Sequence, residues 1–207
     1  MTKYIVRLLL LALPLIAASC SETPAEESEF DNWQERNDTY FNTAYQTAKN
    51  NPGNYKLIRS WSLPENVGQT PESYIVAQVL HEGSGTVSPM YSDSATIHYR
   101  GRFIPSKSFA AGYVFDQTWA GDYNLSTMEP VTLCVGKMID GFTTALMHMH
   151  PGDRWLVTIP YGLAYGTSVY STSSSSVAIP ACSDLVFDIT MVSFHRPGTQ
   201  VPETGSN

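Results

Sequence analysis

Apolar and polar residues alternate over most of the chain after residue 73, which is the pattern of half-buried β-strands. Clusters of glycine, proline and asparagine divide this pattern, which predicts strands at residues 73–80, 94–103, 130–135, 153–159 and 184–194. Between the third and fourth strands the period changes to that of one helix face, with apolar residues at Phe142, Ala145, Leu146 and Met149. The stretch "HPGD" then ends the helix. One helix on one face of a largely antiparallel sheet is a small α+β fold, with a concavity where helix, sheet and loops meet.

An amphipathic helix is predicted upstream of the strands. Its apolar stripe keeps close to helical spacing and stops near "NNPGN", with members at Phe30, Trp33, Phe41, Ala44, Tyr45 and Ala48. The stripe of this 30–50 helix either packs against the body of the protein or docks a protein partner. Packing is the commoner reason for such a face, so we favour it.

The first residues have the pattern of an export signal. Lys3 and Arg7 precede the apolar run 8–16 and three small residues, and this run is too short to span a bilayer. Cys20 follows directly, which resembles the lipobox of bacterial lipoproteins, where the cysteine is lipidated and becomes the mature N-terminus. The resemblance implies a lipid anchor in the bacterial envelope, which we assign to the outer membrane, with the protein facing the periplasm or the surface. The alternative is an ordinary cleaved signal with an incidental cysteine.

The amino-acid composition restricts the class of binding partner and the cysteine chemistry. The chain of 207 residues fits one domain with an extension, and its 12 basic and 19 acidic side chains give a net charge of −7. This balance disfavours a nucleic-acid partner, because phosphate backbones are bound by clustered Lys and Arg. Apart from Cys20 the cysteines are Cys134 and Cys182, which either form a disulfide in an oxidising compartment or remain free. Strand alternation places Cys134 on the face opposite Val131, so two free thiols fit the pattern at least as well.

Five motifs follow one another in the second half of the chain. They are "EGSG" at 82–85, "IHYRG" at 97–101, "FD" at 115–116, "IDGF" at 139–142 with "MHPGD" after it, and "IPYGLAYG" from 159 with "AIP" and "LVFDITM". With these motifs in this order, residues 73–195 resemble an FKBP-type peptidyl-prolyl cis-trans isomerase domain. The resemblance implies an FKBP-like antiparallel sheet wrapped on one short α-helix, with an N-terminal helical extension.

The chain then divides into four parts. Residues 1–19 are expected to be a lipoprotein signal peptide, and 20–72 an acidic tether followed by the amphipathic helix. Residues 73–196 form the isomerase domain, and 197–207 a flexible tail. The domain has two long loops, at 103–114 and 167–176, and the serine-rich second one acts either as a flap over the cleft or as an inert insertion.

The resemblance also implies which residues form the ligand-binding pocket. It implies that the Tyr165 hydroxyl donates to a ligand carbonyl inside an apolar pocket, with Gly162 and Gly166 giving the backbone its sharp turns. A second donor to that carbonyl is the backbone N–H of Ile179. Tyr99 is expected to donate a hydrogen bond to Asp116, which compensates a carboxylate buried among aromatic rings. The other lining residues implied are Phe115, Val131, Met138, Ile139, Phe142 and Phe187.

Such a pocket needs no nucleophile, metal or cofactor. Rotation about an X-Pro bond is slow because it breaks amide resonance, and an apolar cavity penalises the planar amide more than the twisted one. The expected function is therefore isomerisation of X-Pro bonds in proline-containing polypeptides of the envelope. Phe142 stands where the family usually has tryptophan, and Val131 where an aromatic is common, so we expect reduced or altered activity. The alternatives are a chaperone or binding module that holds chains without turnover, and a docking subunit of a surface complex.

Overall fold

A computed structural model describes residues 28–67, 69–171 and 177–198. The predictions on the signal peptide 1–19, on Cys20 and on most of the tail 197–207 fall outside these residues. The helices are α1 (Trp33–Asn50) and α2 (Asp140–Leu146), with short 3-10 turns at Pro71–Ser73, Val135–Lys137 and Tyr161–Leu163. The strands are β1 (Tyr55–Arg59), β2 (Tyr74–His81), β3 (Ser94–Phe103), β4 (Val114–Gln117), β5 (Val131–Cys134), β6 (Arg154–Ile159) and β7 (Leu185–His195).

The seven strands form one antiparallel sheet in the order β1-β2-β6-β7-β3-β4, and β5 continues the β4 edge by pairing with β3. The α+β plan and the five strands read from alternation are confirmed, whereas β1 and β4 were not predicted. Both are short edge strands, of five and four residues, whose own pattern is weak. They form because β2 and β3 offer them a hydrogen-bonding edge.

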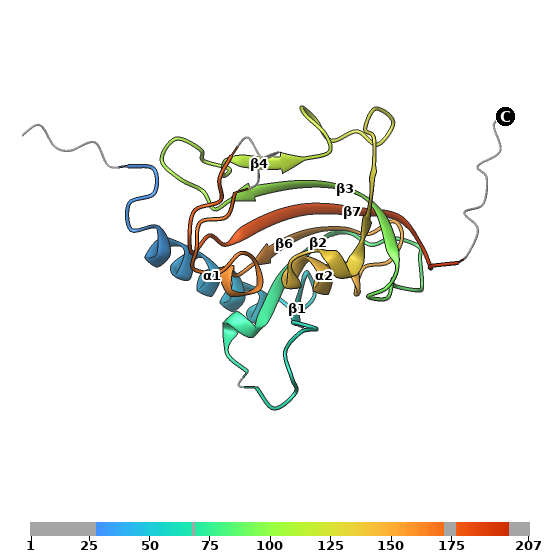
Figure 1. The fold of residues 1–207 in the computed structure, drawn as a ribbon, viewed down its shortest axis with the longest axis horizontal. Helices are drawn as coiled ribbons and strands as arrows, with labels where there is room; N and C mark the ends of the chain where they lie inside the picture. Colours follow the sequence, from blue (N-terminus) through green and yellow to red (C-terminus); the bar gives the residue numbers. More distant parts are fainter. Residues whose placement is uncertain (1–27, 68, 172–176, 199–207) are drawn as a thin grey trace, which may run out of the picture.

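Helix α2 lies against the concave face of the sheet, which curls around it (Figure 1). Its Phe142, Ala145 and Leu146 are buried together with Ile75 and Val157 of the strands beneath. The helix ends one turn earlier than its apolar repeat predicted, although Met149 is still completely buried. Burial of this face is what holds the helix, because seven residues are too few to form a stable helix alone.

Helix α1 covers the opposite face of β1, β2 and β6 (Figure 1). Phe41 and Ala48 are each 2% exposed and contact Val76, which points away from α2. At the start of the helix, Trp33 Nε1 donates to Ser183 Oγ at 2.8 Å. Packing against the body is thus confirmed for Trp33, Phe41 and Ala48, whereas Phe30 remains exposed. Docking of a protein partner by this helix stays a prediction.

The two cysteines of the domain are free thiols. Cys134 is exposed on β5 and Cys182 is buried beside the start of β7. The alternative of a disulfide between them is therefore not the one observed. Among the residues that the structure describes, no group of three or more His, Cys, Asp and Glu gathers as a metal site, and no helix combines the length and apolarity needed to cross a bilayer.

Candidate active site

A cavity of about 360 Å³ opens between α2, the concave sheet face and the loop after β6. Strand β3 contributes Tyr99, β4 contributes Phe115 and Asp116, and β7 contributes Phe187. The segment that leads into α2 contributes Lys137, Met138 and Ile139, and the helix itself contributes Phe142. The complete lining is Tyr99, Phe115, Asp116, Leu133, Lys137, Met138, Ile139, Phe142, Tyr165, Tyr170 and Phe187.

Aromatic rings form the floor and walls. Phe142 is 4% exposed, and its ring centroid lies 4.9 Å from that of Phe187 in an edge-to-face arrangement. Tyr99 approaches the Phe142 ring edge-on at 6.0 Å, and Phe115 meets Phe187 at 5.7 Å and 90°. These separations and angles are those that aromatic pairs prefer, so the rings hold one another in place. The sequence prediction that the rings at 99, 142, 165 and 187 share one cavity agrees with this geometry.

Gly101 leaves the space in which the rings of Phe115 and Phe187 approach each other. It lies on β3 opposite Phe187 and next to the β4 pair, with Asp116 as its cross-strand partner. A Cβ atom at this position would come within 2.6 Å of the Phe187 ring and 2.7 Å of the Phe115 ring. The glycine of "IHYRG" is therefore required by a close approach of side chains.

The hydroxyls of Tyr99 and Tyr165 are two of the polar groups that line the cavity, beside Asp116, Lys137 and Tyr170. Tyr99 Oη donates to Asp116 Oδ2 at 2.6 Å, as predicted. Burial raises the pKa of Tyr99 above its ordinary value, and the bond to the carboxylate raises it further. Burial, with the nearby Tyr170 and Asp116, raises the pKa of Tyr165 to about 12. Both hydroxyls thus keep their protons near neutral pH and act as donors.

The expected environment of Asp116 needs correction. The residue is exposed at the mouth of the cavity, not buried among the rings, because β4 is an edge strand whose end faces solvent. Little desolvation cost therefore arises there. The bond from Tyr99 instead fixes the direction of the Tyr99 ring, which forms one wall.

Ile179 and Val131 do not line the cavity. The Ile179 N–H, expected to be a donor to the ligand, donates at 2.8 Å to the Tyr170 carbonyl and is not free. The Tyr170 N–H returns a bond to the Ile179 carbonyl at 2.9 Å, and this pair closes the loop between them. Val131 packs against the core, while Leu133 on the same strand face lines the cavity.

A different backbone amide is available. Ile139 lines the cavity and stands directly before α2 with φ −58° and ψ 149°. Within the described part of the chain, its N–H has no hydrogen-bond acceptor. The amides at the start of a helix have no partner inside the helix, which explains why this donor is left open.

Tyr170 was missed by the sequence interpretation. Its ring stacks on Tyr165 with centroids 3.9 Å apart and planes 18° apart, and its hydroxyl bonds that of Tyr165. It comes from the long loop after "AYG", and nothing in its local pattern distinguishes it from the neighbouring exposed residues. Leu133, by contrast, could have been found from the alternation that it shares with Val131.

The two glycines on either side of Tyr165, Gly162 and Gly166, differ in backbone conformation. Gly166 has a φ of 75°, a conformation that favours glycine, whereas Gly162 does not have a positive φ. The chain turns at both positions, because Gly162 lies in the 3-10 turn Tyr161–Leu163, but only Gly166 adopts the left-handed conformation that favours glycine. The flap hypothesis for the serine-rich loop involves residues 172–176, which are not among the described ones.

Residues 85–192, just over half of the chain, match the family model of FKBP-type peptidyl-prolyl cis-trans isomerases. The "Macrophage infectivity potentiator" of Trypanosoma cruzi is 34% identical over 126 residues, which is 61% of this chain and 56% of that protein. The "FKBP-type 22 kDa peptidyl-prolyl cis-trans isomerase" of Escherichia coli is 33% identical over 137 residues, 66% of this chain and 57% of that protein. The chain thus spans a little over half the length of these relatives.

Solved structures of similar fold agree with the sheet and helix arrangement. A peptidyl-prolyl cis-trans isomerase from Pseudomonas syringae superposes with a TM-score of 0.52 at 22% identity, covering 82% of this chain and 98% of that one. FkpA from Escherichia coli gives the same TM-score at 21% identity, over 81% of this chain and 63% of that one. At these identities the likeness shows the fold.

Proposed function

The chain belongs to the FKBP-type peptidyl-prolyl cis-trans isomerase family, and we propose that residues 73–196 catalyse rotation about X-Pro bonds of exported or envelope proteins. The observation that carries the proposal is the apolar cavity walled by Tyr99, Phe142 and Phe187, with hydroxyl donors at its rim. A prolyl ring is a compact apolar group, and such a cavity accepts it while excluding water.

Catalysis in such a cavity rests on the difference between a planar and a twisted amide. The planar amide carries more charge separation across its C–N bond, so removing it from water costs more free energy. The barrier in water is about 18–20 kcal/mol, and each reduction by about 1.4 kcal/mol raises the rate tenfold. A few contacts that are stronger in the twisted state are therefore sufficient.

The donors fix the substrate in this proposal. The Ile139 N–H takes the role that the sequence had suggested for Ile179, since it is open and lies on the cavity wall. The Tyr165 hydroxyl is the second donor and is held protonated by its raised pKa. Phe142 and Phe187 hold the proline ring by contact. Orientation of this kind converts binding into catalysis without any covalent step.

A protease-coupled assay on a short proline peptide tests the proposal. The wild type should accelerate isomerisation, and Tyr165→Phe should lower kcat/KM by roughly 2- to 12-fold, the effect of one hydrogen bond of about 0.5–1.5 kcal/mol. Asp116→Ala releases the Tyr99 ring from its hydrogen bond and should also lower it. Tyr161→Phe is the matched control, because Tyr161 does not line the cavity. A wild-type rate equal to the uncatalysed one would exclude the isomerase function.

A binding module remains the second candidate, and one observation favours it. Tyr170 lies flat on Tyr165 and bonds its hydroxyl, so a ligand carbonyl has to compete for that donor. A protein of this kind would hold extended apolar segments with slow turnover. Suppression of aggregation of an unfolded client, by a protein without measurable isomerisation, would support it.

We also propose that the chain is exported and anchored through a lipid on Cys20, which follows three small residues after a short apolar run. Metabolic labelling with an alkynyl fatty acid should mark the wild type and leave Cys20→Ser unmarked. Fractionation of inner and outer membranes would then locate the labelled protein. Absence of label from the wild type would favour the ordinary cleaved signal.

A further inference from the structure

A second hollow, of about 320 Å³, lies where the segment before α1 meets the long loop between β3 and β4. Apolar side chains make up nearly all of its walls, and three of them are aromatic residues from the two loops. Its lining is Glu29, Phe30, Trp33, Phe103, Ser106, Phe109, Tyr113 and Val177. Phe30 and Phe109 remain 44% and 41% exposed, so the hollow leaves apolar surface open to a ligand.

Hydrogen bonds hold the two sides of this hollow together. The Glu29 carboxylate accepts bonds from Ser106 Oγ, from the Ser108 N–H at 3.2 Å and from Ser108 Oγ at 2.8 Å. These bonds lower the pKa of Glu29. Arg36 Nη1 donates to the Glu29 carbonyl at 2.9 Å, and its Nη2 donates to the Pro105 carbonyl at 3.3 Å. The one carboxylate of the lining is thus satisfied by the wall itself.

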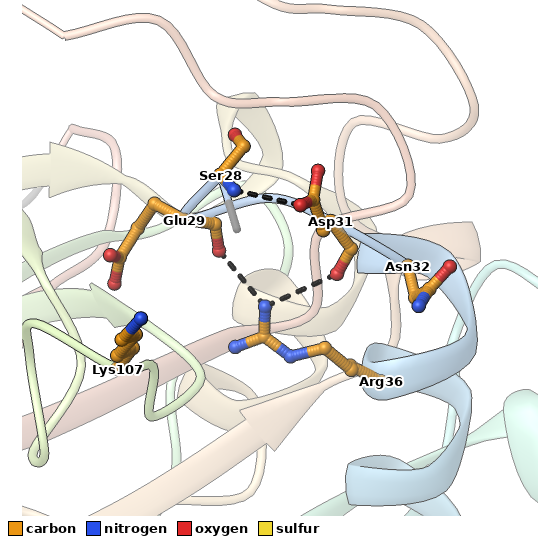
Figure 2. A pocket seen from close by; sticks show the side chains of 6 residues that line it. All are labelled: Ser28, Glu29, Asp31, Asn32, Arg36 and Lys107. Carbon is orange, nitrogen blue, oxygen red and sulfur yellow. Dashed lines mark hydrogen bonds between the residues drawn. The ribbon is translucent and has the colours of Figure 1, made fainter. Parts of the chain in front are cut away.

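Figure 2 shows a neighbouring polar hollow at the same junction, called the back hollow here, which is lined by Ser28, Glu29, Asp31, Asn32, Arg36 and Lys107. Arg36 reaches from α1 to the main chain of the preceding segment, and its Nη1 also bonds the Asp31 carbonyl. Lys107, from the β3–β4 loop, lies beside Glu29 on the other side of this back hollow (Figure 2). The apolar hollow is therefore built on a cross-linked support, which makes its shape preformed.

The two cavities lie side by side along one strand. Tyr99 lines the first and Phe103 the second, and both point to the same face of β3 as Gly101 between them. The Phe103 ring stacks on Phe115, a wall of the first cavity, at 5.1 Å and 28°. Four strand residues span about 13 Å, at about 3.3 Å each, so one extended chain of about four residues reaches from one hollow to the other.

We propose that this hollow is a second subsite for the polypeptide substrate, and that it takes an apolar, preferably aromatic, side chain about four residues from the proline. In an extended chain, residues separated by an even number point to the same side, so an offset of four brings both side chains to this face. The proposal rests on the proposed isomerase function. The Phe103–Phe115 stack joins this hollow to the prolyl cavity. We therefore choose the polypeptide substrate as its occupant, because one chain can contact both.

The test uses the full chain and peptides that contain one Leu-Pro bond. A short peptide of four residues serves as the reference. Longer serine-rich peptides carry a phenylalanine four residues before the proline, four residues after it, two residues away, or none. Both KM and kcat are measured, and the Kd of each labelled peptide is measured by fluorescence anisotropy.

We expect phenylalanine at offset four, on one side of the proline, to lower KM and Kd about tenfold relative to the peptide without it, since burying such a ring is worth at least that factor. The kcat should not change. Phe109→Ser should abolish this advantage and leave the short peptide unaffected. Leu125→Ser is the matched control, because Leu125 is 54% exposed and lies outside both linings.

The outcomes separate the two proposals. If the short peptide is not isomerised, the proposed function fails. The Kd values of the longer peptides still test the subsite, because binding does not require turnover. If phenylalanine at offset four gives no tighter binding than at offset two, the subsite is wrong. An advantage that persists in Phe109→Ser would also overturn it, because the side chain would then be bound elsewhere.

Discussion

Replacing Ile139 by proline removes one main-chain N–H from the prolyl cavity and demands little of the backbone. Ile139 has a φ of −58°, and proline fixes φ near −65°. Met138 before it has φ −91° and ψ 169°, in the extended region that a residue before proline favours. The N–H at this position takes no part in the hydrogen bonds of α2, which begins at Asp140. We therefore expect Ile139→Pro to fold like the wild type.

The size of the effect follows from one hydrogen bond. A substrate carbonyl left without a donor in a dry cavity loses about 1–3 kcal/mol, which corresponds to a roughly 5- to 150-fold fall in kcat/KM. Part of any loss comes from the missing side chain of Ile139. The matched control is Ile139→Ala, which removes most of the side chain and keeps the N–H, so the ratio between the two variants measures the donor.

The assay is protease-coupled isomerisation of a short proline peptide, with thermal unfolding recorded for each variant. The proline variant should have at least fivefold lower kcat/KM than the alanine variant at similar stability, a factor set by about 1 kcal/mol. Equal kcat/KM for the two, with equal unfolding temperatures, would refute the role of the Ile139 amide, and the main-chain donor would then have to lie in the loop after β6.

Three further predictions concern two positions at the cavity, Tyr170 and Gly101, and one buried carboxylate outside it, Asp184. Tyr170→Phe keeps the ring stacked on Tyr165 but removes the competing hydroxyl, so KM for the short peptide should fall about threefold, as expected for part of one hydrogen bond; an unchanged KM would show that no such competition exists. Gly101→Ala forces two cavity rings apart, and should lower both kcat/KM and the unfolding temperature, in contrast to Gly162→Ala, which has open space around its Cβ position. Burial raises the pKa of Asp184 from 3.8 to about 8, so the folded state holds a proton that the unfolded state releases. The unfolding free energy should therefore fall by up to about 1.4 kcal/mol per unit as the pH rises from about 4 to 8, and Asp184→Asn should remove this slope in denaturant titrations; a slope that survives the substitution would assign it to other groups.

Much of the fold could be read from periodicity. The strands at 94–103 and 184–194 are long and alternate clearly, and the structure places β3 and β7 there with the largest pairing in the sheet. Helix α1 follows from its stripe and its stop signal. The edge strands β1 and β4 could not be read in the same way, because a strand of four or five residues gains its structure from the neighbour that it pairs with.

The site was predicted through motifs, and three aromatic residues on β3, α2 and β7 line the cavity as predicted, whereas Val131 on the four-residue edge strand β5 does not. Tyr99, Phe142 and Phe187 stand on β3, α2 and β7, where strand or helix geometry fixes the direction of a side chain. Ile179 and Tyr170 stand on a loop, where the direction of a backbone N–H depends on which partner it meets. The bond between these two residues decides that the Ile179 amide is closed, and no local pattern announces it.

The sequence by itself determined the α+β class, the helix that fills the concave face, the order of the motifs and hence the family. These depend on periodicity and local residue types, which are properties of neighbours along the chain. Only the tertiary structure decided that Asp116 faces solvent, that Ile139 carries the open amide, and that Phe30 and Phe109 form one hollow with Phe103. Each of these depends on segments far apart in the chain that meet only after folding, so exposure and free hydrogen-bonding groups are set by the packing and not by the local sequence.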